Sequence, residues 1–292
     1  MSYKYVVGID GGGTRCRALL QDIDGNTLGE GAAGPANIMT NPEQAMGSVI
    51  DATLDAIEST ALPITCEEVL LAAGLAGANI PQAKQSFLAL DNPFSDTVVI
   101  SDLHAACLGA HENQSGALII CGTGSAATRY DKGVFTDKGG YGLQVGDDAS
   151  GAWLGLSAIK HVLLSYDGVE PVSELKKRIC EHLNLASPQQ LVTLVANYNA
   201  ADFGDIAPVV IQAYRDQCAA ATSLIRKGAN YLNQLGEALI NQASTLPLCL
   251  VGGLADVYTP LLSSSISSNL TAPLKSAEYG AISFAKRVKS EW

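Results

Sequence analysis

Val6-Val7-Gly8-Ile9-Asp10-Gly11-Gly12-Gly13-Thr14 decides the fold of this 292-residue chain. An apolar β-branched run ends in an acid, and three glycines and a hydroxyl residue follow before apolar alternation resumes. This order predicts a strand, a tight turn and a second strand. Because glycine lacks a Cβ, the N–H groups of the turn can approach a ligand closely, and such donors suit phosphate oxygens. Asp10 lies where a phosphate-bound Mg²⁺ would sit. The alternative is an ordinary glycine-rich hairpin turn.

The pattern around that turn predicts a meander followed by alternating helices and strands. Three strands are expected over 4–10, 16–22 and 26–31, with a hairpin turn at Asp24-Gly25. Hydrophobic periodicity then predicts a helix over 42–61, a strand over 69–73, a short helix near 81–90 and a strand over 97–100. Ser101-Asp102 ends that strand, and a helix of about ten residues is expected to begin there. The order βββαβαβα indicates an α/β fold.

The same pattern starts again after Gly116. Strands are expected over 117–121, 126–131 and 134–138, and a glycine and hydroxyl turn at 122–125 separates the first two. The turns fall at offsets that match those of the first half, which indicates an internal repeat. We therefore expect two domains, 1–115 and 116–292.

The second half also carries an expected helical stretch over 149–242, broken near Asp167-Gly168, Ser187-Pro188 and Phe203-Gly204. A buried strand over 248–251 then leads to Gly252-Gly253 and another helix. The last helix, over 277–289, is a candidate to pack back on the first domain. Its basic residues Lys286, Arg287 and Lys289 complement the helix dipole.

Composition excludes several classes of protein. The chain is 47% hydrophobic and 16% charged, and its net charge of −11 leaves no basic face for nucleic acid. Seven cysteines, odd in number and without a Cys-x-x-Cys pair, predict free thiols in a reducing cytosol. No apolar run is long enough for a signal peptide or a membrane span, so no membrane association is expected.

Two glycine-rich turns on two repeats suggest that a phosphate group is held from both sides. The sequence has no Gly-Lys-Ser/Thr, so neither turn is a P-loop. Gly122-x-Gly124-x-x-Ala127 formally fits the dinucleotide fingerprint, but 128–131 continue as a strand where that motif requires a helix. NAD binding is therefore not expected.

Asp102 follows a strand at its carboxyl end, where open α/β sheets place ligands. On local sequence it is equally well the N-cap of the next helix. As a catalytic group it would accept the proton of an attacking hydroxyl while a phosphoryl group moves in line. His104 is expected to be a packed or surface histidine.

Two further loops carry candidate ligand-binding groups. The loop over 139–151 is too glycine-rich for packing; Asp147 or Asp148 is expected to cap the next helix, which leaves the other to bind hydroxyls. Asn37, in Gly34-Pro35-Ala36-Asn37, offers the donor and the acceptor that suit a sugar hydroxyl. An exposed turn asparagine is the alternative for Asn37.

Six motifs, which follow one another in the same order over nearly the whole chain, resemble those of one family. They are Gly8-Ile9-Asp10-Gly11-Gly12-Gly13-Thr14, Gly34-Pro35-Ala36-Asn37, Ser101-Asp102-Leu103-His104-Ala105-Ala106, Gly122-Thr123-Gly124-Ser125, Gly139-Gly140-Tyr141-Gly142 with Gly146-Asp147, and Val251-Gly252-Gly253. Together they resemble the N-acetylglucosamine kinase and glucosamine kinase family, within the actin-like sugar-kinase and chaperone ATPase superfamily. Each motif alone is weak, and the set is specific.

The resemblance implies two ribonuclease-H-like domains with a cleft between them, and Mg²⁺- and ATP-dependent phosphorylation of an amino-sugar 6-hydroxyl. It implies Asp102 as general base and Asp10 as the Mg²⁺ residue, directly or through water. The implied sugar contacts are Asn37, Gly77, Asp102, Gly140, Tyr141, Gly142 and Asp147. The implied ATP contacts are Gly11, Gly12, Gly13, Thr14, Gly122, Thr123, Gly124, Gly252 and Gly253.

The chain departs from the family at the sugar side. Members often have Trp where Tyr141 stands, and some have a hydroxyl residue or Cys where Ala76 and Lys138 stand. N-acetylglucosamine is the expected substrate and glucosamine the alternative, because the two differ only around the 2-substituent. Family members often form homodimers, but no apolar stripe in the sequence demonstrates one.

Two other functions within the superfamily compete with the kinase. A dehydratase-activating ATPase needs an iron–sulfur cluster on closely placed thiolates, whereas no two cysteines lie closer than 14 positions. A sugar-responsive repressor needs a DNA-binding domain ahead of the first strand. Here we expect that strand to begin already at Tyr3 or Lys4, which disfavours a repressor.

Overall fold

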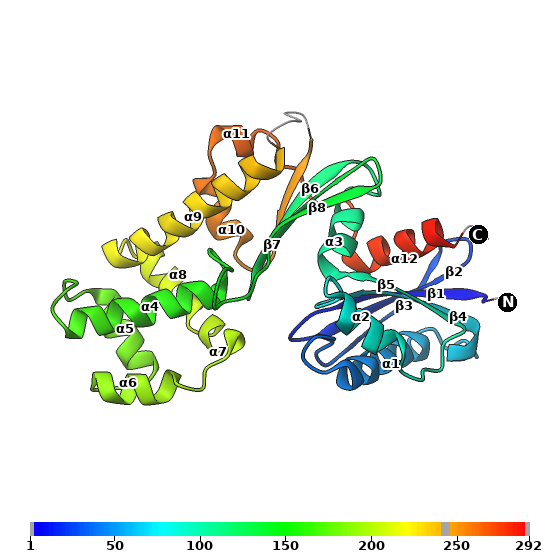
Figure 1. Ribbon diagram of the computed structural model, residues 1–292, viewed down its shortest axis with the longest axis horizontal. Coiled ribbons are helices and arrows are strands. Elements are labelled where there is room, and N and C mark those ends of the chain that lie inside the picture. The colour runs from blue at the N-terminus through cyan, green and yellow to red at the C-terminus, as the bar shows by residue number, and fades with distance from the viewer. Residues whose placement is uncertain (1–2, 241–245, 290–292) are drawn as a thin grey trace. The chain divides into compact units, whose positions relative to one another are not determined.

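The computed structural model describes residues 3–240 and 246–289, and their contacts divide them into two units (Figure 1). The first unit holds 3–116, 129–135 and 272–289. The second holds 117–128, 136–240 and 246–271. The sequence-based boundary after residue 115 differs from this division in two segments, 129–135 and 272–289, because both make their contacts within the first unit.

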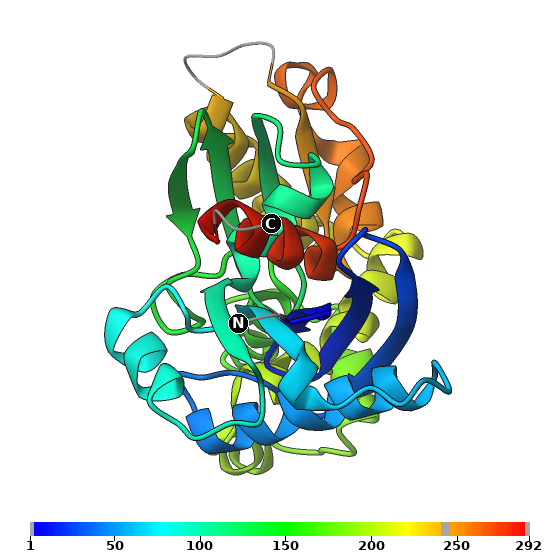
Figure 2. The same ribbon diagram turned by 90° about the vertical axis from the view of Figure 1, so that its right-hand side faces the viewer.

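A five-stranded sheet forms the centre of the first unit. Its strands are β1 (Tyr5–Gly11), β2 (Cys16–Asp22), β3 (Thr27–Ala33), β4 (Val69–Leu75) and β5 (Asp96–Ser101). Their order is β3-β2-β1-β4-β5; the pairs β1 with β2 and β2 with β3 are antiparallel, whereas β1 with β4 and β4 with β5 are parallel (Figure 2). The parallel strands therefore end at one edge of the sheet.

Helices cover both faces of this sheet (Figure 2). They are α1 (Pro42–Glu58), α2 (Pro81–Leu88), α3 (Asp102–Ala110) and α12 (Ala277–Val288). Val7 and Ile9 of β1 share a buried cluster with Val49 of α1. The intervening Gly8 faces α12 instead, where a Cβ would lie 2.1 Å from the Glu278 carbonyl oxygen. Period-2 alternation along β1 thus sorts its side chains between the two layers.

The second sheet repeats the strand order of the first. It consists of β6 (Gly116–Cys121), β7 (Ser125–Asp131), β8 (Val134–Gly139) and β9 (Leu248–Val251), in the order β8-β7-β6-β9. This order matches β3-β2-β1-β4, and β9 runs parallel to β6 as β4 does to β1. The internal repeat predicted from the turns is therefore present in the fold.

Helices make up most of the second unit. They are α4 (Gly151–Tyr166), α5 (Glu174–His182), α6 (Pro188–Val195), α7 (Ala200–Gly204), α8 (Ala207–Arg215), α9 (Ala219–Ile240), α10 (Ala255–Tyr258) and α11 (Ser264–Ser267). Short 3₁₀ turns at Cys66–Glu68 and Thr259–Leu261 complete the helical elements among the described residues. Leu154 and Val162 of α4 are buried with Ile225 and Leu232 of α9 in one core.

Several helix boundaries differ from the predicted ones. The helix predicted over 42–61 ends at Glu58, and Ala61 has a φ of 56°. The stretch predicted as one helix after Phe203-Gly204 is broken again between Arg215 and Ala219. Its predicted end at residue 242 lies outside the described residues.

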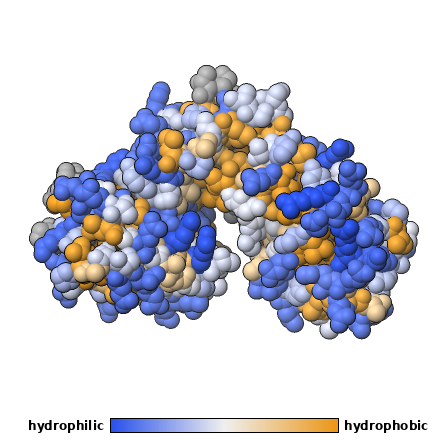
Figure 3. Space-filling model, turned by 180° about the vertical axis from the view of Figure 1, so that it is seen from behind, coloured by the Kyte–Doolittle hydropathy of each residue, from blue (hydrophilic) through white to orange (hydrophobic). Residues whose placement is uncertain are grey.

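The surface in Figure 3 is mostly hydrophilic, with apolar residues interspersed. Among the described residues, no helix is long and apolar enough to cross a membrane.

Candidate functional site

The predicted ligand-binding residues of the first unit follow the carboxyl ends of its parallel strands. Gly11 of β1 pairs in register with Leu75 of β4, and Leu75 pairs with Ser101 of β5. Asp10 and Asp102 therefore lie at the same edge of the sheet, where α/β sheets bind ligands.

Asp102 is the first residue of α3 and is not its N-cap. Ser101 caps the helix, with its Oγ accepting from the His104 N–H at 3.2 Å, so the N-cap alternative for Asp102 is wrong. Asp102 Oδ1 accepts a hydrogen bond from the Leu103 N–H at 2.8 Å. Burial raises the pKa of Asp102 to about 6, and the negative charge of Asp10 adds to the effect. A carboxylate with this pKa is ionised near neutral pH and can accept a proton.

Asp10 ends β1 in an ion pair with Arg17 of β2. The two residues face each other in the antiparallel register, and Arg17 Nη2 lies 2.5 Å from Asp10 Oδ2. The described residues contain no cluster of three or more metal-binding side chains. One carboxylate with substrate oxygens and water is a donor set that Mg²⁺ accepts, so Asp10 fits the predicted Mg²⁺ role.

The first glycine turn is fixed at its base and open at its tip. The Gly12 N–H donates to the Arg15 carbonyl at 2.9 Å, and the Gly12 carbonyl accepts from the Ala36 N–H at 2.9 Å. Gly13 and Thr14 are exposed, and a Cβ on Gly13 would meet no atom within 4 Å. The tip therefore offers its N–H groups to solvent or to a ligand.

Asn37 and Gly77 lie together beside the same sheet edge. Asn37 forms a parallel bridge with Ala76, and its Oδ1 accepts from the N–H groups of Met39 at 3.0 Å and Thr40 at 3.3 Å. A Cβ on Gly77 would lie 3.1 Å from that same Oδ1. The Asn37 oxygen thus holds its own loop, which leaves the amide N–H₂ as the group suited to a ligand hydroxyl.

The second glycine turn, Gly122 to Ser125, packs against the start of α4. The carbonyls of Gly122 and Thr123 accept from the N–H groups of Gly151 at 2.8 Å and Ala152 at 3.2 Å. Because Ile120 of β6 pairs with Val251 of β9, the Gly252-Gly253 turn lies at the same edge of the second sheet. Gly252 has a φ of 104° and passes so close to Cys121 that a Cβ would lie 2.3 Å from its carbonyl oxygen.

Asp147 lies against the second glycine turn. Its Oδ1 accepts from the Gly142 N–H at 3.2 Å, and a Cβ on Gly124 would lie 2.8 Å from its Oδ2. Burial raises the pKa of Asp147. The Gly140 N–H donates to the Ser125 carbonyl at 3.0 Å, so the predicted 140–142 backbone and Asp147 meet at this turn, whereas Tyr141 is 72% exposed.

The predicted capping role of Asp147 or Asp148 is wrong. Ser150 caps α4, with its Oγ accepting from the Trp153 N–H at 3.1 Å. The backbone carbonyl of Asp148 accepts from Ser125 Oγ at 2.7 Å. A serine competes well with aspartate as an N-cap, and the sequence offered both within four residues.

Sequence reasoning missed Arg17 and Glu278, which contact the site from β2 and α12. The predicted hairpin over 4–10 and 16–22 placed Arg17 within one residue of the position opposite Asp10, although it did not fix the register. Glu278 lies far along the chain and gave no signal. The packed histidine was found: the His104 ring stacks on Phe135, with ring centroids 3.9 Å apart.

A cavity of about 640 Å³ opens among helices of the second unit. It is lined by Trp153, Ser157, Lys160, His161, Leu164, Glu170, Pro171, Val172, Ser173, Glu174, Cys218, Ala219, Ala220, Ser223, Leu224 and Lys227. None of the predicted site residues lines it, so it is separate from the two glycine turns.

Residues 7–275 match the BadF/BadG/BcrA/BcrD ATPase family. The chain belongs to this family. It is 33% identical over 286 residues to glucosamine kinase GspK of Vibrio cholerae serotype O1, covering 97% of this chain and 96% of that protein. It is 26% identical to an N-acetylmuramic acid/N-acetylglucosamine kinase of Clostridium acetobutylicum, over 86% of this chain and 85% of the relative.

A solved structure agrees with the fold. A Chromobacterium violaceum protein, provisionally called an N-acetylglucosamine kinase, superimposes with a TM-score of 0.91 at 28% identity, covering 97% of this chain and 99% of the other. The predicted family resemblance and the predicted α/β fold with two ribonuclease-H-like sheets are confirmed. The predicted class of enzyme, an ATP-dependent sugar kinase, is confirmed as well, and the comparisons leave the sugar open.

Proposed function

We propose that this BadF/BadG/BcrA/BcrD family member transfers the γ-phosphoryl group of ATP to the 6-hydroxyl of a hexosamine, with Asp102 as the general base. The observation that carries the proposal is the place of Asp102 at the strand edge, with a pKa that burial raises to about 6. Such a group is ionised at working pH yet basic enough to take a proton from an attacking hydroxyl.

The other predicted residues take roles that match their surroundings. The exposed tip at Gly13 and Thr14 offers backbone and hydroxyl donors to phosphate oxygens. In the turn at Gly122 to Gly124 the Gly122 N–H donates to the Gly124 carbonyl, which leaves Thr123 and Gly124 as the donors for a phosphate. Asn37 and Asp147 present an amide and a carboxylate to sugar hydroxyls. Mg²⁺, bound at Asp10 directly or through water, would neutralise charge on the transferred phosphoryl group.

N-acetylglucosamine is the first candidate sugar and glucosamine is the second. The 33% identity to a glucosamine kinase favours glucosamine, whereas two relatives at 26% and 28% carry names that include N-acetylglucosamine. Both sugars need the same base and phosphate turns. The two sugars differ in what they require around the 2-substituent. A site built to bind the acetyl group leaves polar groups unpaired when that group is missing.

Location and assembly belong to the same proposal. The seven cysteines, all among the described residues, form no disulfide, which supports the cytoplasm as the compartment. A homodimer rests on the family resemblance alone, and sedimentation of the purified protein measures it.

An ATP-coupled assay over four sugars tests the proposed function. Glucosamine, N-acetylglucosamine, N-acetylmannosamine and glucose are each supplied with ATP and Mg²⁺, and ADP release is followed together with formation of the sugar 6-phosphate. We expect turnover with one of the two glucosamine-type sugars well above the other substrates. Absence of turnover with both would refute the proposal.

A further inference from the structure

The guanidinium of Arg17 bridges two carboxylates that come from different elements. Its Nη2 lies 2.5 Å from Asp10 Oδ2 at the end of β1, and its Nε lies 3.0 Å from Glu278 Oε1 in the first turn of α12. The contact with Asp10 is a charge-assisted hydrogen bond, which is stronger than a neutral one, whereas the contact with Glu278 is an ion pair without a hydrogen bond. The orientation of Asp10 is thus linked to α12.

The backbone of Glu278 packs closely on β1, and its side chain is buried. It is only 6% exposed, and its backbone carbonyl presses on β1 at Gly8, where a Cβ would lie 2.1 Å from the carbonyl oxygen. Its Oε2 is buried and has no hydrogen-bond partner among the described residues. A buried carboxylate is costly unless it is paired, and pairing alone seldom makes such a group stabilising. The ion pair therefore calls for a role other than stability.

We propose that Glu278 and Arg17 are positioning residues for Asp10. Glu278 holds Arg17, Arg17 holds Oδ2 of Asp10, and Oδ1 stays available to the metal that accompanies the nucleotide. The inference rests on the proposed function, because it assumes that Asp10 serves Mg²⁺. Groups that orient a metal-binding carboxylate typically change metal affinity by about 10–100-fold when they are removed.

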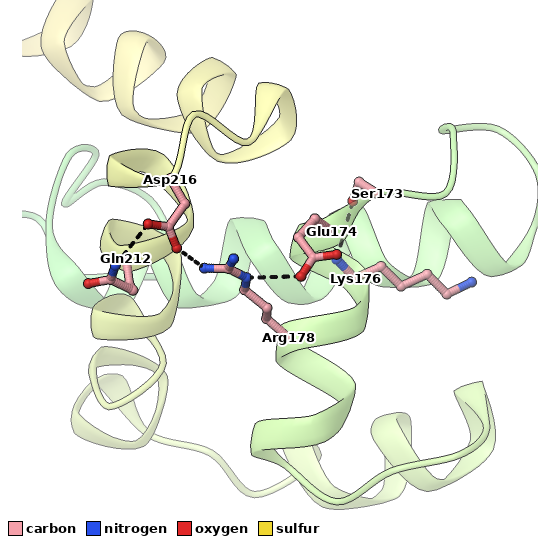
Figure 4. Close-up of polar contacts among 6 residues, drawn as sticks. All are labelled: Ser173, Glu174, Lys176, Arg178, Gln212 and Asp216. Carbon is pink, nitrogen blue, oxygen red and sulfur yellow. Dashed lines mark hydrogen bonds and ion pairs between the residues drawn. The ribbon is translucent and has the colours of Figure 1, made fainter.

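The chain contains a matched arrangement in the second unit that serves as a control (Figure 4). Arg178 of α5 also bridges two carboxylates: its Nε lies 3.3 Å from Glu174 Oε1, and its Nη1 lies 2.5 Å from Asp216 Oδ2. The Glu174 side chain is 50% exposed, and none of the three belongs to the predicted site. Surface ion pairs of this kind contribute little to stability.

A direct contact between Arg17 and the nucleotide is the alternative role for this arginine. The two roles differ in how they depend on the metal. If Arg17 acts on Asp10, its loss weakens binding of the metal–nucleotide complex only. If Arg17 touches phosphate, binding of the metal-free nucleotide weakens as well.

Calorimetric titration with ADP, in Mg²⁺ and separately in EDTA, tests the inference. The proteins are wild type, Arg17→Lys, Glu278→Gln, the double variant, and Glu174→Gln as the control. We expect Arg17→Lys and Glu278→Gln each to weaken Mg²⁺–ADP binding roughly tenfold, with affinity in EDTA unchanged. The double variant should lose no more than Arg17→Lys alone, because Glu278 acts through Arg17. Glu174→Gln should bind as wild type does.

Three results would overturn the inference. Equal losses in Mg²⁺ and in EDTA would assign Arg17 to the nucleotide itself. Unchanged affinities with a lowered melting temperature would show that the ion pairs of Arg17 serve stability only. Additive losses in the double variant would show that Glu278 does not act through Arg17.

Should Glu278→Gln fail to fold, Arg17→Lys alone decides the inference, since the Arg17 side chain is 43% exposed. Wild-type protein that gains no affinity from Mg²⁺ would instead count against the proposed function.

Discussion

Asp102 begins α3 at the sheet edge where Asp10 ends β1, and the negative charge of Asp10 adds to burial in raising the pKa of Asp102 to about 6. Arg17 balances the charge of Asp10 from the neighbouring strand. One carboxylate of the pair therefore has an ion-pair partner, while burial raises the pKa of the other. This division separates a group suited to metal binding from one suited to proton transfer.

Asp102→Asn should abolish most phosphoryl transfer and keep sugar binding. The amide has nearly the same shape but cannot accept the proton, and general-base catalysis contributes roughly 10²–10⁴-fold. Steady-state kinetics measures kcat, and calorimetric titration with the preferred sugar measures binding. A variant with near wild-type kcat would show that the base is another residue.

The same substitution should change the pH dependence of stability. The folded-state pKa of Asp102 is raised above its unfolded value, so the folded protein binds more protons between about pH 4 and pH 6. Its contribution to stability is full below the unfolded pKa and is lost as pH rises through about 6. Asp102→Asn carries no such charge and should be more stable than wild type at pH 8, by on the order of 1–3 kcal/mol.

Urea unfolding at pH 8 and pH 4 measures this difference. We expect the gain of Asp102→Asn at pH 8 to shrink toward zero at pH 4, where wild-type Asp102 is protonated. A gain that is equal at both pH values would show that the carboxyl group is not buried at a cost.

Much of the fold could be predicted from the sequence because its signals are local. Alternating apolar residues and glycine turns marked β1 to β3 and their repeat in β6 to β8, each within two residues of the observed bounds. The break between α8 and α9 was missed because it contains neither Gly nor Pro; Gln217 makes it with a φ of 61°. Only the packing of the helices on either side selects that conformation.

The candidate site, like the fold, could be predicted only where its residues follow a local pattern. Asp102, Asn37 and Gly77 follow strands or loops that the pattern marks, and the structure gathers them at one sheet edge. Glu278 gave no signal, because its place depends on α12 packing against β1 at Gly8. Contacts between elements far apart in sequence leave no periodicity to read.

Gly8→Ala should destabilise the first unit strongly. The added methyl group would lie 2.1 Å from the Glu278 carbonyl oxygen and 2.8 Å from Ile282 Cγ1, so α12 would have to move off β1. Overpacking of this kind costs about 1–3 kcal/mol or more. Gly47→Ala is the matched control, because Gly47 lies within α1 and a Cβ there would meet no atom within 4 Å. It should stabilise by roughly 0.5–1 kcal/mol through helix propensity.

Urea unfolding followed by far-ultraviolet circular dichroism compares the two variants with wild type. A Gly8→Ala protein as stable as wild type would show that α12 does not pack on β1 at this residue. That result would also remove the anchor inferred for Glu278.

Thiol reactivity should follow burial along the chain. Burial raises the pKa of Cys16 to about 12 and that of Cys121 to about 12, so neither forms appreciable thiolate at pH 8. Cys218 is only half-buried and lines the cavity beside α9. Brief treatment of native protein with iodoacetamide at pH 8, followed by peptide mass spectrometry, should label Cys218 well before Cys16 and Cys121. In urea all three should react at similar rates, because the difference comes from the folded structure. Early labelling of Cys16 in native protein would mean that β2 is open to solvent beside the first glycine turn.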